Sequence, residues 1–221
     1  MRAVLLIGSP RGERSTSRAL GAYMLEGLRS RGWEVGERYA CRDVTTSEGL
    51  TDLLAEMERS DLSILSFPTY VDSPPAAVMR VMETMHGRIK RGGALLAMAN
   101  CGFIGSGNNT SSLSICRLFA RDIGWEWRGG LSLGGGNVLA GRALQDAGGV
   151  ARNVRRALDQ AVSALAEGKA VPQGAIDLLG RNIVPSLLYN ITANRAWDRA
   201  ARKNNVLDRI RDRPYMEEER R

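Results

Sequence analysis

Short apolar runs alternate with helical patterns over most of the chain. Three runs contain few polar residues and are bounded by Gly, Pro or polar positions: residues 3–7 (AVLLI), 62–67 (LSILSF) and 94–99 (ALLAMA). A run without strict alternation is typical of a strand that is covered on both faces, as in a parallel sheet. Weaker strand patterns at 34–40 and 125–133 complete a set of five predicted strands.

Between these strands, apolar residues recur at spacings of three and four, which predicts amphipathic helices. The predicted helices span 16–31, 50–59, 74–88, 111–123 and about 144–167. The order of strand, loop and helix, repeated five times, predicts an α/β doubly wound parallel sheet with ligands beyond the carboxyl ends of its strands.

The pattern changes beyond Gly168, where prolines and glycines interrupt a segment that adds helices and no further strand. Residues 183–191 (IVPSLLYNI) are apolar and could cover the core, pack on a partner subunit or touch a membrane surface. Core or subunit packing is favoured, because membrane-surface helices usually carry a continuous Lys/Arg face. The chain therefore divides into residues 1–168, which carry the sheet, and a helical extension at 169–221.

The loop after the first strand carries the most informative chemistry. Its sequence, GSPRGERSTS, brings hydroxyls to the start of a helix, whose free N–H groups and positive dipole end favour a phosphate. Ser9 and Arg11 would close such a site from the other side. The alternative interpretation is a strand-to-helix turn with an ordinary serine cap and no ligand.

Two common phosphate loops do not fit this stretch. A GxxxxGK[ST] loop requires a lysine, and the first Lys in the chain is Lys90; a GxGxxG fingerprint fails because Gly8 is followed by Ser, Pro and Arg. A cup of hydroxyls for a single phosphomonoester remains. The third and fourth strands end at the same sheet edge, in the loops 68–73 and 100–109.

Composition and charge exclude several other classes of function. The chain has 221 residues and a net charge of +7, but its basic residues are spread among acids along the helices and form no dense stripe, which argues against nucleic-acid binding. Its start carries no export signal and no segment is long enough to span a bilayer, so we expect a cytoplasmic protein. Three cysteines without CxxC spacing argue against a metal or cluster site and predict free thiols.

Three motifs together resemble the flavodoxin-like NADPH-dependent FMN reductases. They are GSPRxxxSTS after the first strand, PTYVDSPPA after the third and the glycine-rich NCGF loop after the fourth. The resemblance covers roughly residues 1–167 and implies a five-stranded parallel sheet of order 2-1-3-4-5, with a flavodoxin-like FMN-binding domain at 1–168. It extends weakly into the tail, where the extension at 169–221 would serve as a cap or in oligomerisation.

In such proteins the FMN phosphate sits in the first loop, so the resemblance implies FMN as cofactor and NAD(P)H as co-substrate. Two further loops would flank the flavin ring, and Cys101 would be a bystander, not a nucleophile. The implied cofactor-binding residues are Ser9, Arg11, Ser15, Thr16, Ser17, Pro68, Thr69, Tyr70, Val71, Asn100, Cys101, Gly102 and Phe103.

The function implied is that of an NAD(P)H oxidoreductase that passes hydride through the flavin to a quinone, a flavin or another small acceptor. No catalytic side chain is expected, since flavin chemistry needs no acid–base pair from the protein. The alternative is a flavin-binding electron-transfer or regulatory module with no substrate turnover of its own. A homodimer or homotetramer is expected, without a nucleic-acid or membrane partner.

Overall fold

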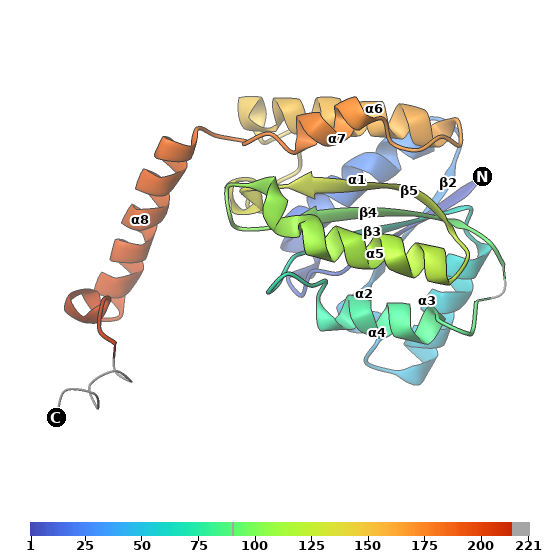
Figure 1. Cartoon of the computed structure of the whole chain (residues 1–221), viewed down its shortest axis with the longest axis horizontal. Coiled ribbons are helices and arrows are strands. Elements are labelled where there is room, and N and C mark those ends of the chain that lie inside the picture. The colour runs from blue at the N-terminus through green and yellow to red at the C-terminus, as the bar shows by residue number, and fades with distance from the viewer. Residues whose placement is uncertain (90, 214–221) are drawn as a thin grey trace. The chain divides into compact units, whose positions relative to one another are not determined.

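The computed structural model describes residues 1–89 and 91–213, which divide into two units between Ile183 and Val184. The first unit is a five-stranded, all-parallel sheet with helices on both faces (Figure 1). Its strand order, β2-β1-β3-β4-β5, is the predicted one. The strands are β1 (Arg2–Ile7), β2 (Glu34–Tyr39), β3 (Leu62–Pro68), β4 (Ala94–Asn100) and β5 (Glu126–Leu133).

Alternate residues of each central strand face two separate hydrophobic cores. In β1, Leu5 and Ile7 point into one core, and Leu6 into the other. Both faces are covered, which explains why the sequence shows continuous apolar runs instead of alternation. The helices of the first unit are α1 (Thr16–Arg29), α2 (Ala40–Asp43), α3 (Ser47–Arg59), α4 (Ala76–Met85), α5 (Thr110–Asp122), α6 (Arg152–Ala166) and α7 (Gln173–Leu179).

Helices α1, α6 and α7 cover one face of the sheet, and α2 to α5 cover the other (Figure 1). Leu20, Met24 and Leu28 of α1 are buried, as the spacing of apolar residues in this helix leads one to expect. Helix α7 adds Ala175 and Leu179 to the same core as α1, so the compact unit continues past Gly168 as far as Ile183.

Two predicted helices were too long: the one at 74–88 spans only Ala76–Met85, because Pro75 is its N-cap and His86 its C-cap, and the one at about 144–167 starts later than expected. The pattern suggested a helix from about 144, but α6 begins at Arg152, after a short 3₁₀ turn at Gly148–Ala151. Gly148 has φ +61°, a left-handed conformation that an α-helix does not accommodate, and so it separates the apolar residues before it from the helix.

The second unit consists mainly of α8 (Ser186–Lys203) and a short 3₁₀ turn at Leu207–Arg209. Several of its large apolar side chains are exposed, among them Leu187, Leu188, Ile191 and Trp197. Among the described helices of the chain, none combines the length and the apolar character needed to cross a membrane.

Candidate functional site

The carboxyl ends of β1, β3 and β4 meet at one edge of the sheet, and their loops enclose a cavity of about 230 Å³. This cavity, the first cavity below, is lined by Ser9, Arg11, Ser15, Thr16, Ser17, Pro68, Thr69, Tyr70, Asn100, Cys101, Gly102, Gly136 and Asn137. All the residues predicted for FMN line it except Val71 and Phe103. The three loops therefore converge on one place, as expected for strands that are parallel and adjacent.

At one end of the cavity, Ser15 is the N-cap of helix α1. It has an extended backbone, and its Oγ accepts a hydrogen bond from the Arg18 N–H at 3.1 Å and donates to the Gly12 carbonyl at 2.6 Å. Thr16 Oγ1 likewise donates to the Gly136 carbonyl at 2.8 Å. These two hydroxyls are engaged within the protein, where they fix the loop against the helix start.

The groups left for an anion at this end are mainly backbone N–H groups. Within the described chain, the N–H groups of Thr16 and Ser17, the first two of α1, make no hydrogen bond. Ser9 Oγ accepts from the Arg11 N–H at 3.3 Å, which leaves its own proton for a ligand. Arg11 is exposed beside them. Free N–H donors at a positive helix end, with a guanidinium, fit a phosphate monoester.

Asn100 forms the floor of the cavity. Its side chain is buried, and its Nδ2 donates to Ser17 Oγ at 2.8 Å and to the Phe67 carbonyl at 3.0 Å. Asn100 thus joins the ends of β3 and β4 to the start of α1. Because these bonds fix three elements together, the cavity is largely pre-formed, as small-molecule sites usually are.

The loop after β4 forms one wall. Cys101 is nearly buried, with its Sγ 3.5 Å from the Phe103 carbonyl oxygen. Burial is the main cause that raises the pKa of the Cys101 thiol, so the thiol stays protonated at neutral pH. A protonated thiol is a poor nucleophile, which argues against a nucleophilic role for Cys101.

Gly102, in the same wall, has no structural requirement to be glycine. A Cβ built on it would have no atom within 4 Å, and its φ lies outside the left-handed range. The chain's own packing would accept a side chain here. The missing side chain keeps this part of the first cavity open, as close approach of a flat ring system to the backbone requires.

The opposite wall is a tight turn in which Tyr70 and Ser73 exchange backbone hydrogen bonds of 3.0 and 3.1 Å. The two residues between them are both left-handed, Val71 with φ +48° and Asp72 with φ +61°. Tyr70 lines the cavity, whereas the Val71 side chain is 99% exposed and Phe103 is 70% exposed. The roles predicted for these two residues toward FMN stay predictions.

Val71 is strained without a packing benefit inside the chain. A β-branched side chain in the left-handed region costs roughly 1–2 kcal/mol, and Asn tolerates that region better. We expect Val71→Asn to raise the free energy of unfolding by about 1 kcal/mol in urea denaturation. Val71→Thr is the matched control, because it adds a polar atom but keeps the β-branch; an equal gain in both variants would contradict the strain argument.

Gly136 and Asn137 line the first cavity but were not predicted. Gly136 donates its N–H to the Cys101 carbonyl at 2.8 Å, and a Cβ on it would lie 2.9 Å from Asn100 Oδ1. Both residues follow β5 in the run GGGN, at the same sheet edge as the other loops. Only a search of the end of every strand, including those without a recognisable motif, would have included them.

The fold recurs in solved oxidoreductase structures of low sequence identity. An NADH:FMN oxidoreductase matches with a TM-score of 0.59 and 15% identity over 83% of this chain and 96% of that chain. An FMN-dependent NADH-azoreductase from Bacillus anthracis matches with a TM-score of 0.53 and 14% identity over 75% of this chain and 100% of that chain.

A third match is the rubredoxin oxygen:oxidoreductase from Desulfovibrio gigas, with a TM-score of 0.55 and 14% identity. It covers 76% of this chain, which spans only 35% of that longer protein. No curated protein sequence matches the chain. At such identities these structures show a shared flavodoxin-like fold.

The sequence itself matches the profile of the NADPH-dependent FMN reductases over residues 1–143. This segment contains β1 to β5 and every residue that lines the first cavity. The anion-binding end and the open wall of the cavity suit the phosphate and the flat ring of FMN. The chain belongs to the NADPH-dependent FMN reductase family and is an oxidoreductase that uses FMN, with NAD(P)H as electron donor.

Proposed function

We propose that this oxidoreductase passes hydride from NAD(P)H by way of FMN to a quinone, a free flavin or another small acceptor. The observation that carries the proposal is the first cavity, which joins free N–H groups at the start of α1 to an open wall at Gly102, at a single sheet edge. Bound FMN would supply the hydride chemistry, and the protein would supply binding and orientation.

We propose that the N–H groups of Thr16 and Ser17, together with Ser9 and Arg11, hold the phosphate. Ser15 contributes by holding the loop on α1, as its two hydrogen bonds indicate. For the ring, the proposed walls are Pro68, Thr69 and Tyr70 on one side and Cys101, Gly102 and Asn137 on the other. Asn100 keeps the two walls and the helix start in register.

No acid–base pair emerges from the residues around the cavity. The single histidine, His86, follows α4 and forms an exposed contact with Asp122, whose Oδ2 lies 2.8 Å from His86 Nε2. Burial raises the pKa of the Cys101 thiol further above neutral pH. The arrangement therefore supports positioning of a reactive cofactor in preference to hydrolysis by a nucleophile and a base.

Titration of the purified protein with FMN, followed by anaerobic mixing with NADPH or NADH, tests the proposal. We expect quenching of flavin fluorescence on binding and loss of flavin absorbance within the dead time or the first seconds after a nicotinamide is added. A protein that takes up no FMN contradicts the proposal. Reduction by a partner protein, but by neither nicotinamide, would favour the alternative of a flavin module without its own turnover.

We further propose that residues 1–168 hold the FMN site, that residues 169–221 serve as a cap or in assembly, and that the protein works in the cytoplasm as a homodimer or homotetramer. The exposed Leu187, Leu188 and Ile191 of α8 support assembly, because clustered apolar side chains on a surface commonly mark contacts between proteins. Light scattering by the purified protein tests the oligomeric state, and a monomer would contradict it.

A further inference from the structure

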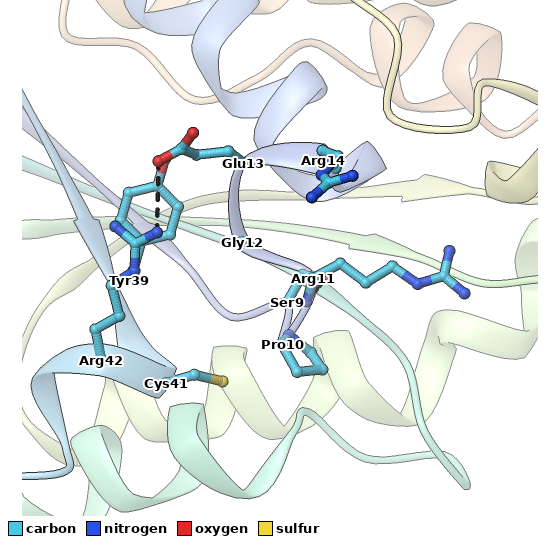
Figure 2. Close-up of a pocket in the computed structure, with 9 residues that line it drawn as sticks. All are labelled: Ser9, Pro10, Arg11, Gly12, Glu13, Arg14, Tyr39, Cys41 and Arg42. Atoms are coloured by element: carbon cyan, nitrogen blue, oxygen red, sulfur yellow. Dashed lines mark hydrogen bonds and ion pairs between the residues drawn. The ribbon is translucent and has the colours of Figure 1, made fainter.

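A second cavity, of about 250 Å³, adjoins the first on the side of β2 (Figure 2). The two cavities share Ser9 and Arg11, so the loop after β1 forms a wall of each. The second cavity is lined by Ser9, Pro10, Arg11, Gly12, Glu13, Arg14, Tyr39, Cys41 and Arg42. Nothing in the proposed binding of FMN uses the part formed by the end of β2 and the start of α2.

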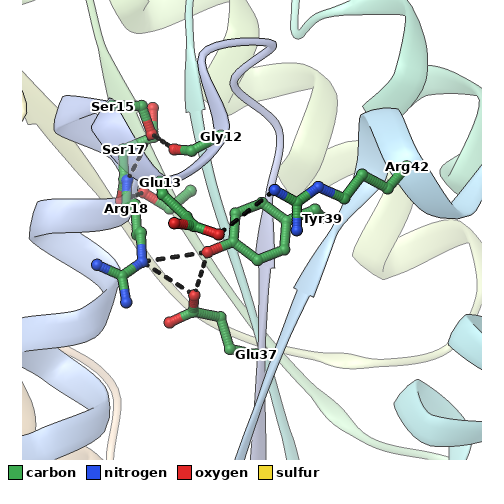
Figure 3. A network of polar contacts seen from close by, with 9 residues as sticks. Gly12, Glu13, Ser15, Ser17, Arg18, Glu37, Tyr39 and Arg42 are labelled. Atoms are coloured by element: carbon green, nitrogen blue, oxygen red, sulfur yellow. Dashed lines mark hydrogen bonds and ion pairs between the residues drawn. The ribbon is translucent and has the colours of Figure 1, made fainter.

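The far wall of this cavity is a fixed aromatic ring. The Tyr39 hydroxyl donates to Glu37 Oε1 at 2.5 Å and accepts from Arg18 Nε at 3.1 Å, and Arg18 Nε also donates to Glu37 at 3.0 Å (Figure 3). This triangle of contacts holds the ring in place before any ligand binds. The Arg42 guanidinium lies over the ring, 4.4 Å from its centroid.

The cavity carries an excess of positive charge. It is lined by three arginines, Arg11, Arg14 and Arg42, against one carboxylate, Glu13. The Arg42–Glu13 contact is 3.4 Å long, and both side chains are about two-thirds exposed, so a competing anion would displace it at little cost. Arg14 forms no ion pair or hydrogen bond through its side chain with any described residue.

This chemistry fits a nucleotide, in which one ribose carries both a planar base and a phosphate. A guanidinium group can bind two phosphate oxygens at once and can also stack on a flat ring, and Arg42, whose Cζ lies over the Tyr39 ring, can do both. Arg11 extends away from Tyr39 in Figure 2 and lines both cavities, so an anion in the second cavity would share this side chain with one in the first.

We propose that the second cavity, lined by Arg14, Tyr39 and Arg42, binds a phosphate of an adenine nucleotide. This inference rests on the proposed function and deepens it. Two sources present the same chemistry: the 2′-phosphate of NADPH, whose binding would give a preference over NADH, and the adenylate phosphate of FAD, whose binding would let FAD replace FMN.

Arg42→Ala tests the assignment by binding, without an activity readout. In calorimetry on the FMN-loaded protein, we expect 2′,5′-ADP to bind about tenfold more weakly to the variant than to the unchanged protein. The affinity for 5′-AMP should change less than twofold, because 5′-AMP lacks the 2′-phosphate. If FAD is the source, the flavin-stripped variant will instead lose affinity for FAD about tenfold, with unchanged affinity for FMN.

Arg29→Ala is the matched control, because Arg29 is another exposed, ion-paired arginine, at the far end of α1, and its removal lowers the net charge equally. The second site is supported if Arg42→Ala, but not the control, selectively loses affinity for 2′,5′-ADP over 5′-AMP or for FAD over FMN. If Arg42→Ala binds both 2′,5′-ADP and FAD with unchanged affinity, or if the control variant loses the same affinities, the second site is overturned. A wild-type protein that binds no FMN would contradict the proposed function separately.

Discussion

Replacement of Gly141 by alanine is expected to lower the free energy of unfolding by about 3 kcal/mol and FMN affinity by more than tenfold. Gly141 follows β5 and has φ +71°. A Cβ on it would lie 2.2 Å from the carbonyl oxygen of Arg14 and 3.2 Å from the backbone nitrogen of Ser15. These atoms belong to the backbone, so the clash cannot be relieved by a side-chain rotation.

The expected loss of FMN follows from where that backbone leads. Displacement of the 14–15 segment would move the Ser15 cap and, with it, the N–H groups of Thr16 and Ser17 that are proposed to hold the phosphate. Urea denaturation and fluorescence titration with FMN measure the two effects separately.

Gly148→Ala is the control that separates the cost of a left-handed backbone conformation from the cost of the steric clash at Gly141. Gly148 also has a positive φ, of +61°, but a Cβ on it would have no atom within 4 Å. We expect this variant to lose about 1–2 kcal/mol in stability and to keep its FMN affinity. If Gly141→Ala and Gly148→Ala both had the FMN affinity of the unchanged protein, the loop after β5 would not support the loop that is proposed to hold the phosphate. This would contradict the proposed phosphate site.

The central strands and their loops could be predicted because their signals are local. A buried parallel strand must be apolar on both faces, and Ser15, next to a turn, must cap the helix that follows. The convergence of the loops 9–17, 68–73 and 100–109 then follows from the strand order, since adjacent parallel strands end at the same edge.

The errors have a different physical origin. The start of α6 at Arg152 depends on the left-handed conformation of Gly148. The backbone conformation of a glycine cannot be inferred from its presence in the sequence. Gly136 contributes to the first cavity through backbone groups that meet Thr16 and Cys101, which are distant in sequence. Contacts of this kind depend on tertiary structure, so no spacing along the chain announces them.

The second cavity could not be foreseen for a similar reason. Tyr39 reaches it from the end of β2 and Arg42 from α2, whereas Arg14 reaches it from the loop after β1. The pairing of β1 with β2 brings the two segments together, with Ile7 opposite Tyr39. In sequence the same arginines belong to a dispersed set of charges, from which only a general attraction to phosphate could be inferred.

Replacement of Gly102 by valine is expected to weaken FMN binding by at least tenfold and to leave the free energy of unfolding within about 0.5 kcal/mol of its original value. The packing around Gly102 offers no obstacle to a Cβ, so stability should not fall. The added methyl groups would instead occupy space at the wall of the first cavity, where the flavin ring is proposed to lie.

The matched control is Gly107→Val, in the same loop region between β4 and α5. A Cβ on Gly107 also has no atom within 4 Å, but Gly107 does not line the first cavity. Fluorescence titration with FMN and urea denaturation of both variants give four values, of which only the FMN affinity of Gly102→Val should change strongly. An unchanged FMN affinity in Gly102→Val would place the flavin ring away from the loop after β4, whereas a large loss of stability would show that this glycine serves the fold and not the ligand.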